Sequence, residues 1–226
     1  MGLGVLPEPL PVAATDTLTA VKLSAILPLP VAVAQQPTSV FIAFDGEPVL
    51  ARIVRALAAT GDVLVAADER LVGRARSDLG GLPVRVVAAG ESPGTADCLA
   101  VAARHLQSES VTHALVADHR HPVLPAGLVQ RVVAALSGGA DLVVPVLPVT
   151  DTVKSVDAQG TILTTVDRSE LRITQYPYGA ALPRLADLHA VLGEPDLVTV
   201  AGDADAIPLD LPGDAALLAA IIACRR

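Results

Sequence analysis

Aromatic residues are almost absent from this chain: there is no Trp, and only two Phe and two Tyr occur among 226 residues. Because 52% of the residues are nevertheless hydrophobic, the core must be built from Val, Leu, Ile and Ala. This composition is typical of buried parallel strands covered by amphipathic helices. The length suffices for one α/β domain with a sizeable core.

Clusters of basic residues are missing as well. The chain has 24 acidic and 16 basic residues, a net charge of -8, and no basic run longer than the terminal Arg225-Arg226. A protein that binds DNA or RNA needs a basic surface to meet the phosphates. We therefore expect no nucleic-acid partner.

Cysteine is scarce, since only Cys98 and Cys224 occur and they form no CxxC pair. This spacing gives no support for a metal site built from thiolates. We expect two reduced, buried thiols in a cytoplasmic protein.

Charged residues are absent between Lys22 and Asp45, a stretch as long as a membrane span. Pro28, Pro30 and Pro37 and two glutamines interrupt it, so we interpret it as a buried strand followed by a loop. The first residues also lack the positive charge that opens a secretory signal. We expect no association with a membrane.

Proline is frequent only at the beginning, where Pro7, Pro9 and Pro11 predict a flexible leader over residues 1–19. Residues 20–226 are then expected to form a single domain.

Within that domain, apolar runs alternate with helical periods. The expected strands are residues 24–29, 63–66, 84–88, 114–117, 142–146 and 197–200, and the expected helices are residues 49–59, 69–77, 95–106, 126–136, 182–191 and 213–223. Such alternation predicts an α/β fold with three layers, in which helices cover both faces of a doubly wound, mostly parallel sheet. Ligands of such sheets bind beyond the carboxyl ends of the strands, here after Leu29, at Asp118 and after Pro145.

Residues 151–166 break this rhythm and predict a hairpin within an arm over about residues 148–170. The arm holds the segment Pro148-Val149-Thr150-Asp151-Thr152-Val153-Lys154, and Asp167-Arg168-x-x-Leu171 and Gln175-x-Pro177 follow it. Asp118-x-x-x-Pro122 precedes it, and Gly202-Asp203 lies near the end.

With these motifs, from about Ala20 to the end, the chain resembles the 2-C-methyl-D-erythritol 4-phosphate cytidylyltransferases, whose motifs are P-V-x-D-T-[IV]-K, R-x-x-L…Q-T-P-Q and H-D-A-A-R-P. The resemblance implies a nucleotide-diphospho-sugar transferase-like fold with a protruding β-arm. It also implies magnesium, with CTP and a phosphorylated alcohol as substrates. A homodimer is implied in which the arm reaches into the partner's active site.

One segment departs from the family pattern. The family has a glycine-rich loop, A-A-G-x-G-x-R, after its first strand and a lysine before the next helix, whereas this chain has Leu29-Pro30-Val31-Ala32-Val33-Ala34-Gln35 and no glycine between Gly4 and Gly46. A triphosphate needs unobstructed backbone amides, which branched side chains and proline do not offer. In the other motifs, Ala117 and His121 replace a histidine and an arginine, and Pro208 replaces a lysine.

Six residues remain candidates for binding nucleotide or substrate, and we assign none to catalysis: Asp118, Asp151, Thr152, Lys154, Arg168 and Gln175. Asp118 is also the one candidate magnesium ligand, although its altered neighbours favour a capping or loop aspartate. Arg168 could bind a phosphate in the partner's site or form a salt bridge in the interface. Asp151, Thr152 and Lys154 are expected to fix the arm and the dimer.

Two further groups lie near these motifs. His119 and His121 are expected in a surface loop, since no Cys or Glu stands at ligand spacing beside them. Tyr176 and Tyr178 are expected to form a packing or recognition surface at the altered pocket.

Two functions follow from this pattern. In the first, the chain keeps the family's fold and dimer, has lost or strongly reduced cytidylyl transfer, and uses the remodelled pocket for binding or regulation, which requires no cofactor. In the second, it is an active CTP-dependent enzyme that uses Mg²⁺ and forms CDP-methylerythritol for isoprenoid biosynthesis.

Overall fold

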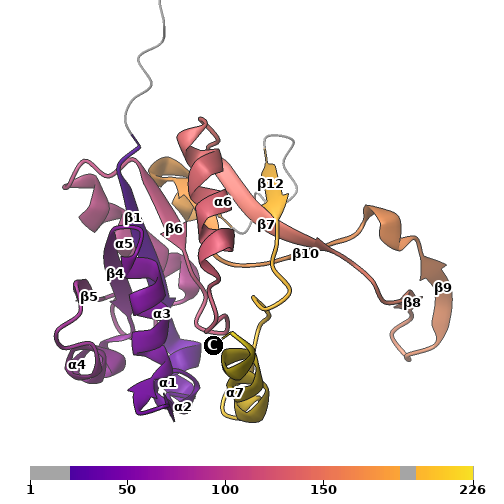
Figure 1. Cartoon of the computed structure of the whole chain (residues 1–226), viewed down its shortest axis with the longest axis horizontal. Helices are drawn as coiled ribbons and strands as arrows, with labels where there is room; N and C mark the ends of the chain where they lie inside the picture. Colours follow the sequence, from indigo (N-terminus) through magenta and orange to yellow (C-terminus); the bar gives the residue numbers. More distant parts are fainter. Residues whose placement is uncertain (1–20, 189–196, 226) are drawn as a thin grey trace, which may run out of the picture.

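A mixed sheet of eight strands organises the protein (Figure 1). The structure is a computed structural model and describes residues 21–188 and 197–225, so the predicted leader over residues 1–19 lies outside the described residues. The strands are β1 (Leu23–Leu29), β4 (Asp62–Ala67), β5 (Val84–Ala88), β6 (His113–Val116), β7 (Leu142–Pro148), β10 (Arg172–Thr174), β11 (Tyr178–Ala181) and β12 (Val198–Ala201).

The sheet has the order β10-β7-β11-β6-β1-β4-β5, and β12 also pairs with β7. β1 is parallel to both β4 and β6, β4 to β5, and β12 to β7. β10 and β11 run antiparallel to their neighbours. The predicted mostly parallel α/β fold is confirmed, and the chain crosses from one side of β1 to the other between β5 and β6.

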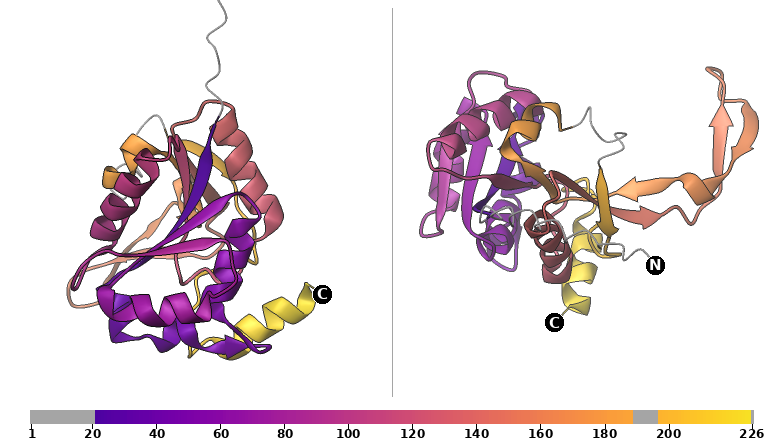
Figure 2. Two further views of the ribbon diagram at one scale, coloured as in Figure 1. Left: turned by 90° about the vertical axis from the view of Figure 1, so that its left-hand side faces the viewer. Right: turned by 90° about the horizontal axis from the view of Figure 1, so that it is seen from above.

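Helices cover both faces of the sheet (Figure 2). On one face lie α3 (Val49–Ala58), α4 (Glu69–Asp78), α6 (Ala126–Ser137) and α7 (Ala215–Cys224). The opposite face is covered by α5 (Thr95–Gln107) and the 3₁₀ helix η2 (Leu182–Asp187). These layers account for the apolar residues on both faces of the central strands, since alternate side chains of a strand point to opposite faces.

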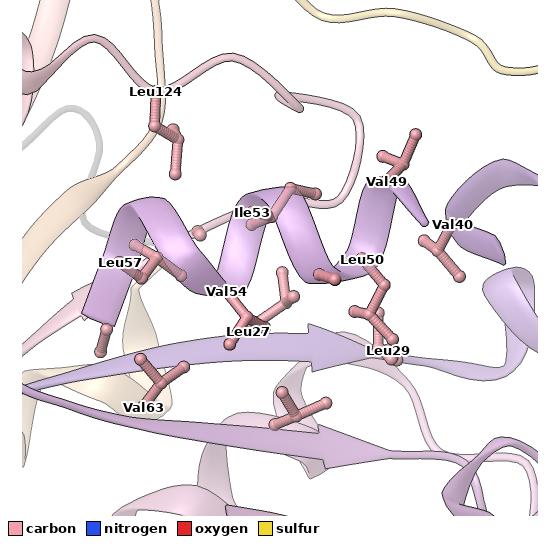
Figure 3. Packing of buried hydrophobic residues seen from close by; sticks show 14 of the residues in the cluster. Leu27, Leu29, Val40, Val49, Leu50, Ile53, Val54, Leu57, Val63 and Leu124 are labelled. Atoms are coloured by element: carbon pink, nitrogen blue, oxygen red, sulfur yellow. The ribbon is translucent and has the colours of Figure 1, made fainter. Parts of the chain in front are cut away.

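The contact between α3 and β1 shows how the core is built (Figure 3). Leu50, Val54 and Leu57 point from α3 toward the sheet, where Val54 lies next to Leu27, and all four side chains are fully buried. Full burial of one such side chain contributes about 1.5–3 kcal/mol. Aliphatic packing of this kind replaces the aromatic core that the composition rules out.

An arm projects from the end of β7 (Figure 2). It consists of β8 (Val153–Val156) and β9 (Ile162–Val166), which form an antiparallel hairpin, and the chain returns through the 3₁₀ helix η1 (Arg168–Glu170) to β10. At the turn, the Asp157 carboxylate accepts hydrogen bonds from the amides of Gln159 and Thr161 at 2.9 and 2.8 Å. The predicted protruding β-arm is confirmed.

The predicted loop after β1 is wrong. The chain instead forms two short helices, α1 (Val31–Gln35) and α2 (Thr38–Phe41), followed by the small hairpin of β2 (Ala43–Phe44) and β3 (Glu47–Pro48). Pro30 and Pro37 stand directly before the two helices. Proline is tolerated at a helix start because the amide it lacks would have no helical partner there.

Three smaller expectations also differ from the structure. β10 and β11 were not predicted, and the helix expected over residues 182–191 is the 3₁₀ helix η2, with residues 189–191 outside the described part. Cys98 is buried as expected, but Cys224 is exposed, because α7 buries only Leu218 fully. None of the helices in the described ranges is long and apolar enough to cross a membrane.

Candidate functional site

A cleft opens beyond the carboxyl ends of β1 and β6, where the chain changes direction across the sheet. It has a volume of about 420 Å³, and its walls come from α1 and α2, from residues 118–120 after β6, and from residues 209–211. Thr95 at the start of α5 completes it. Such crossover points are where doubly wound sheets bind ligands.

Asp118 lies in the wall of this cleft, as its position after β6 predicts. Its Oδ1 accepts a 2.7 Å hydrogen bond from the Arg120 amide, and its Oδ2 accepts one of 3.2 Å from the Arg120 guanidinium. Burial acts to raise the pKa of Asp118, but the hydrogen bonds from Arg120 outweigh it and keep the pKa below its ordinary value. Asp118 is therefore a charged carboxylate whose two oxygens already have a partner.

His121 is buried rather than exposed, so the predicted surface loop is wrong for this residue. Only 4% of it is accessible, and neither ring nitrogen has a hydrogen-bond partner among the described residues. Its ring lies 5.2 Å from that of Tyr176, which in turn stacks on Tyr178 at 4.1 Å. Burial lowers the pKa of His121 to about 4, so the ring is neutral near pH 7.

His119 lies beside this cluster and also lines the cleft. Burial lowers its pKa, an effect that Asp118 opposes. Tyr176 lines the adjoining part of the cleft, and burial raises its pKa. The expectation that the two tyrosines form a packing surface at this pocket agrees with their stacking.

The segment after β1 forms the opposite wall. The amide of Val31 donates to the Pro93 carbonyl at 2.8 Å, and the amides of Val33 and Ala34 donate to the Pro30 carbonyl at 2.9 and 3.3 Å. These three amides are thus used within the protein. The side chains that this wall gives the cleft are uncharged, namely Ala32, Gln35, Gln36 and Ser39.

Residues 209–211 also line the cleft, although they are distant in sequence from its other walls. No sequence pattern predicts this. Leu209 is held there because its amide donates to the Arg120 carbonyl at 2.7 Å. Asp210 adds a second carboxylate to the lining. Two carboxylates therefore face a single guanidinium, Arg120, in the described lining.

The arm, which carries four of the candidates, projects away from α1 and α2 (Figure 1), whose residues form one wall of the cleft. Asp151 and Thr152 are exposed at the base of the arm. Lys154 donates to the Thr165 hydroxyl across the hairpin, and Arg168 donates to the Thr150 carbonyl. Their binding roles stay predictions.

Gln175 is placed in the interior, with 2% of its surface accessible. Its Nε2 donates to the carbonyls of Asp203 and Ala206, both at 2.8 Å, and its Oε1 accepts the Asp203 amide at 2.8 Å. The side chain thus fastens residues 203–206 to the end of β10. It offers no free polar atom to a ligand in this arrangement.

Asp118 has no free oxygen for a magnesium ion in this arrangement. Magnesium prefers oxygen ligands in octahedral geometry, but both oxygens of Asp118 are engaged by Arg120. No group of three or more His, Cys, Asp or Glu side chains that could hold a metal occurs among the described residues. Asp210 is the other carboxylate in the described lining of the cleft.

The sequence and the fold of this chain are similar to those of one known protein family. The family model described as 2-C-methyl-D-erythritol 4-phosphate cytidylyltransferase matches residues 32–216. The protein of that name from Saccharopolyspora erythraea is 39% identical over 154 residues, which are 66% of this chain and 69% of that protein. The one from Rhodococcus opacus is 38% identical over 143 residues, 62% of this chain and 61% of that protein, so the match spans less than two thirds of its length.

A solved structure of the same name from Thermus thermophilus has a TM-score of 0.64 at 26% sequence identity. The superposition covers 91% of this chain and all of that one. The likeness thus extends over most of this chain.

Proposed function

Since this chain belongs to the 2-C-methyl-D-erythritol 4-phosphate cytidylyltransferase family, we propose that it keeps the family's fold, that cytidylyl transfer from CTP is lost or strongly reduced, and that the cleft binds another ligand. The observation that carries this proposal is the state of the backbone after β1. Val31, Val33 and Ala34 donate their amides to protein carbonyls. Phosphate sites are built from amides that point freely at the ligand.

The charges of the cleft support the same proposal. Transfer of a nucleotidyl group depends on cations and amide donors that meet the charge on the phosphates. Here Arg120 is paired with Asp118, and Asp210 adds further negative charge. A triphosphate would be repelled rather than held.

The same lining suits a ligand of different chemistry. Gln35, Gln36 and Ser39 offer hydrogen bonds without charge, and Tyr176 offers an aromatic ring. Small-molecule sites commonly combine such an apolar surface with a few polar groups. We propose that the cleft binds a small neutral or cationic molecule and that the protein has a binding or regulatory role.

A second candidate is CTP-dependent formation of CDP-methylerythritol for isoprenoid biosynthesis, with Mg²⁺ bound alongside the substrate. Two observations favour it: relatives at 38–39% identity carry the cytidylyltransferase name, and the arm keeps Asp151, Thr152, Lys154 and Arg168 at the family's motif positions. Other residues would then have to supply the cations. The cytoplasmic location expected from the sequence fits either candidate and stays a prediction.

A homodimer through the arm is part of the proposal. Val156, Ile162, Leu163 and Ile173 are exposed by 54, 63, 64 and 48%. The first three lie on the projecting hairpin and Ile173 lies on β10, and large apolar side chains exposed in this way favour burial against another surface. A second copy of this chain is the partner that the family resemblance implies.

Calorimetric titration of CTP with magnesium into the full chain tests the function directly. We expect no site tighter than about 1 mM and no pyrophosphate release when methylerythritol phosphate is added. A micromolar CTP site would contradict the proposal, and turnover would establish the second candidate. If turnover is seen, Asp118→Asn must abolish it, since a contaminating enzyme would be unaffected by that change.

A further inference from the structure

A second pocket lies between α3 and α7. Residues 122–124, which follow the loop that carries Asp118, also line it. It has a volume of about 430 Å³ and shares no lining residue with the cleft. Three of its lining side chains are arginines: Arg52 and Arg55 from α3, and Arg225 directly after α7. In a chain with a net charge of -8, this concentration of positive charge requires an explanation.

Two of these arginines are neutralised within the protein. Arg55 pairs with Glu47, which also lines the pocket, and Arg225 pairs with Asp205 at 2.6 Å. Arg52 differs from both. Within residues 21–188 and 197–225 it has no hydrogen-bond or ion-pair partner, and its Nε is buried.

An unpaired guanidinium with a buried nitrogen is costly, because burial removes water without supplying a replacement partner. Nε itself has no surface open to the pocket, but an anion there would supply a partner to the terminal nitrogens of Arg52, which have none among the described residues. A guanidinium presents two parallel N–H groups, which match the paired oxygens of a carboxylate or a phosphate. Arg55 and Arg225 at the same pocket would strengthen the attraction.

The remaining lining defines what the anion would carry. Val123 and Leu124 are each 9% exposed and face the pocket together with Ile222. These side chains would cover an apolar group attached to the anionic head. The volume falls within the range of about 300–1,000 Å³ that is usual for small-molecule sites.

We propose that this pocket binds a small organic anion, a phosphate monoester or a carboxylate, with its head on Arg52 and its apolar body against Val123, Leu124 and Ile222. The site is independent of the cleft and of the function proposed for it. Its occupant also contacts residues 122–124, which continue the segment that holds Asp118.

The test titrates phenyl phosphate, benzoate and inorganic phosphate into the full chain at low salt, with binding followed by calorimetry. We expect phenyl phosphate or benzoate to bind more tightly than inorganic phosphate, since only they also fill the apolar part. Benzyl alcohol, which has the ring without the charge, should not bind. Failure of all three anions to bind below about 10 mM would overturn the proposal.

Variants locate the site. Arg52→Met keeps the aliphatic stem and should weaken binding at least about tenfold, whereas Arg104→Met, a change of an exposed helical arginine on α5 outside the pocket, should have no effect. Equal binding by the unchanged chain and Arg52→Met would overturn the proposal. Arg52→Met must first show a thermal unfolding midpoint no lower than that of the unchanged chain, and removal of the unpaired guanidinium is expected to raise it.

Glu47→Gln gives an answer even if Arg52→Met does not fold. It removes the carboxylate from the lining and frees Arg55, so binding should tighten by about two- to tenfold. Weaker or unaltered binding in Glu47→Gln would contradict an anion site at these arginines.

Discussion

The cleft and the arm use their polar groups in opposite ways. In the cleft, backbone amides and charged side chains already have partners within the protein. Asp118 is ion-paired with Arg120, and the Val31 amide donates to the Pro93 carbonyl. In the arm, the side chains that match the family motif are exposed and bond only within the arm, as Lys154 does. Exposed residues contribute little to the stability of one chain. Packing within one chain therefore does not account for the motif in the arm, which supports a role in assembly or ligand contact.

The largest expected effect comes from truncating a leucine in the core, compared with a leucine in the arm. Leu27→Ala removes a fully buried side chain beneath α3 and should lower the free energy of unfolding by about 2–5 kcal/mol. Leu163→Ala in the arm, where the side chain is 64% exposed, should change it by less than about 0.5 kcal/mol at protein concentrations that keep the chain monomeric. Urea unfolding of both variants measures this, and equal losses would break the contrast.

A smaller effect is expected at Gln175, where the strand returning from the arm rejoins the sheet. Gln175→Leu keeps the shape but leaves the amide of Asp203 and the carbonyl of Ala206 without a partner, whereas the carbonyl of Asp203 still accepts the Ala206 amide. Each unsatisfied buried group costs about 1–3 kcal/mol, part of which water recovers, so we expect a loss of about 2–4 kcal/mol. Urea unfolding without any loss of stability would show that Gln175 is free for a ligand.

The free energy of unfolding should also depend on pH, through His121. Because burial lowers the pKa of His121 to about 4, the unfolded state binds its proton first as the pH falls. The stability from a neutral His121 is thus complete above about pH 6.5 and is lost between there and about pH 4, by up to about 1.4 kcal/mol per pH unit.

His121→Leu should flatten this dependence in urea unfolding between pH 4.5 and 7.5. His113 and His119, whose pKa values burial also lowers, remain in the variant and retain part of the slope. The groups around His121 that contribute charge are Asp118, His119 and Arg120. Identical slopes in the variant and the unchanged chain would remove His121 from this account.

The smallest effect is expected at Lys154. Lys154→Ala removes an exposed hydrogen bond to Thr165 and should change the free energy of unfolding of the monomer by less than about 0.5 kcal/mol. The same variant in sedimentation equilibrium reports on the dimer. A large loss of monomer stability would show that the arm belongs to the core after all.

The central strands could be predicted from the sequence because they are apolar on both faces and end at clear turns, as β1 and β4 do. The helices α1 and α2 could not be predicted in this way, because proline is more typical of loops, although Pro30 and Pro37 stand where a helix tolerates proline best. β11 could not be predicted from the sequence because Tyr178–Ala181 is four residues long and follows a proline. Short strands of this kind are fixed by their neighbours in the sheet and not by their own pattern.

The site was predicted in part for a similar reason. Asp118 could be placed because it ends an apolar strand, whereas Asp210 could not, since only the hydrogen bond between Leu209 and Arg120 brings it there. The burial of His121 depends on Tyr176 in the same way. Contacts between residues so far apart in sequence leave no local pattern to read.

The position of β7 has a consequence for the order in which the protein folds. β1, β4 and β5 pair within residues 23–88, but β7 pairs with β10, β11 and β12, all of which follow it in the chain. During synthesis the first three strands emerge together, while β7 waits for partners that extend to residue 201. Pairings of long sequence separation form slowly. The edges of β7, and the edge of β1 that pairs with β6 only after residues 113–116 are made, are therefore parts of the nascent chain that need protection from aggregation.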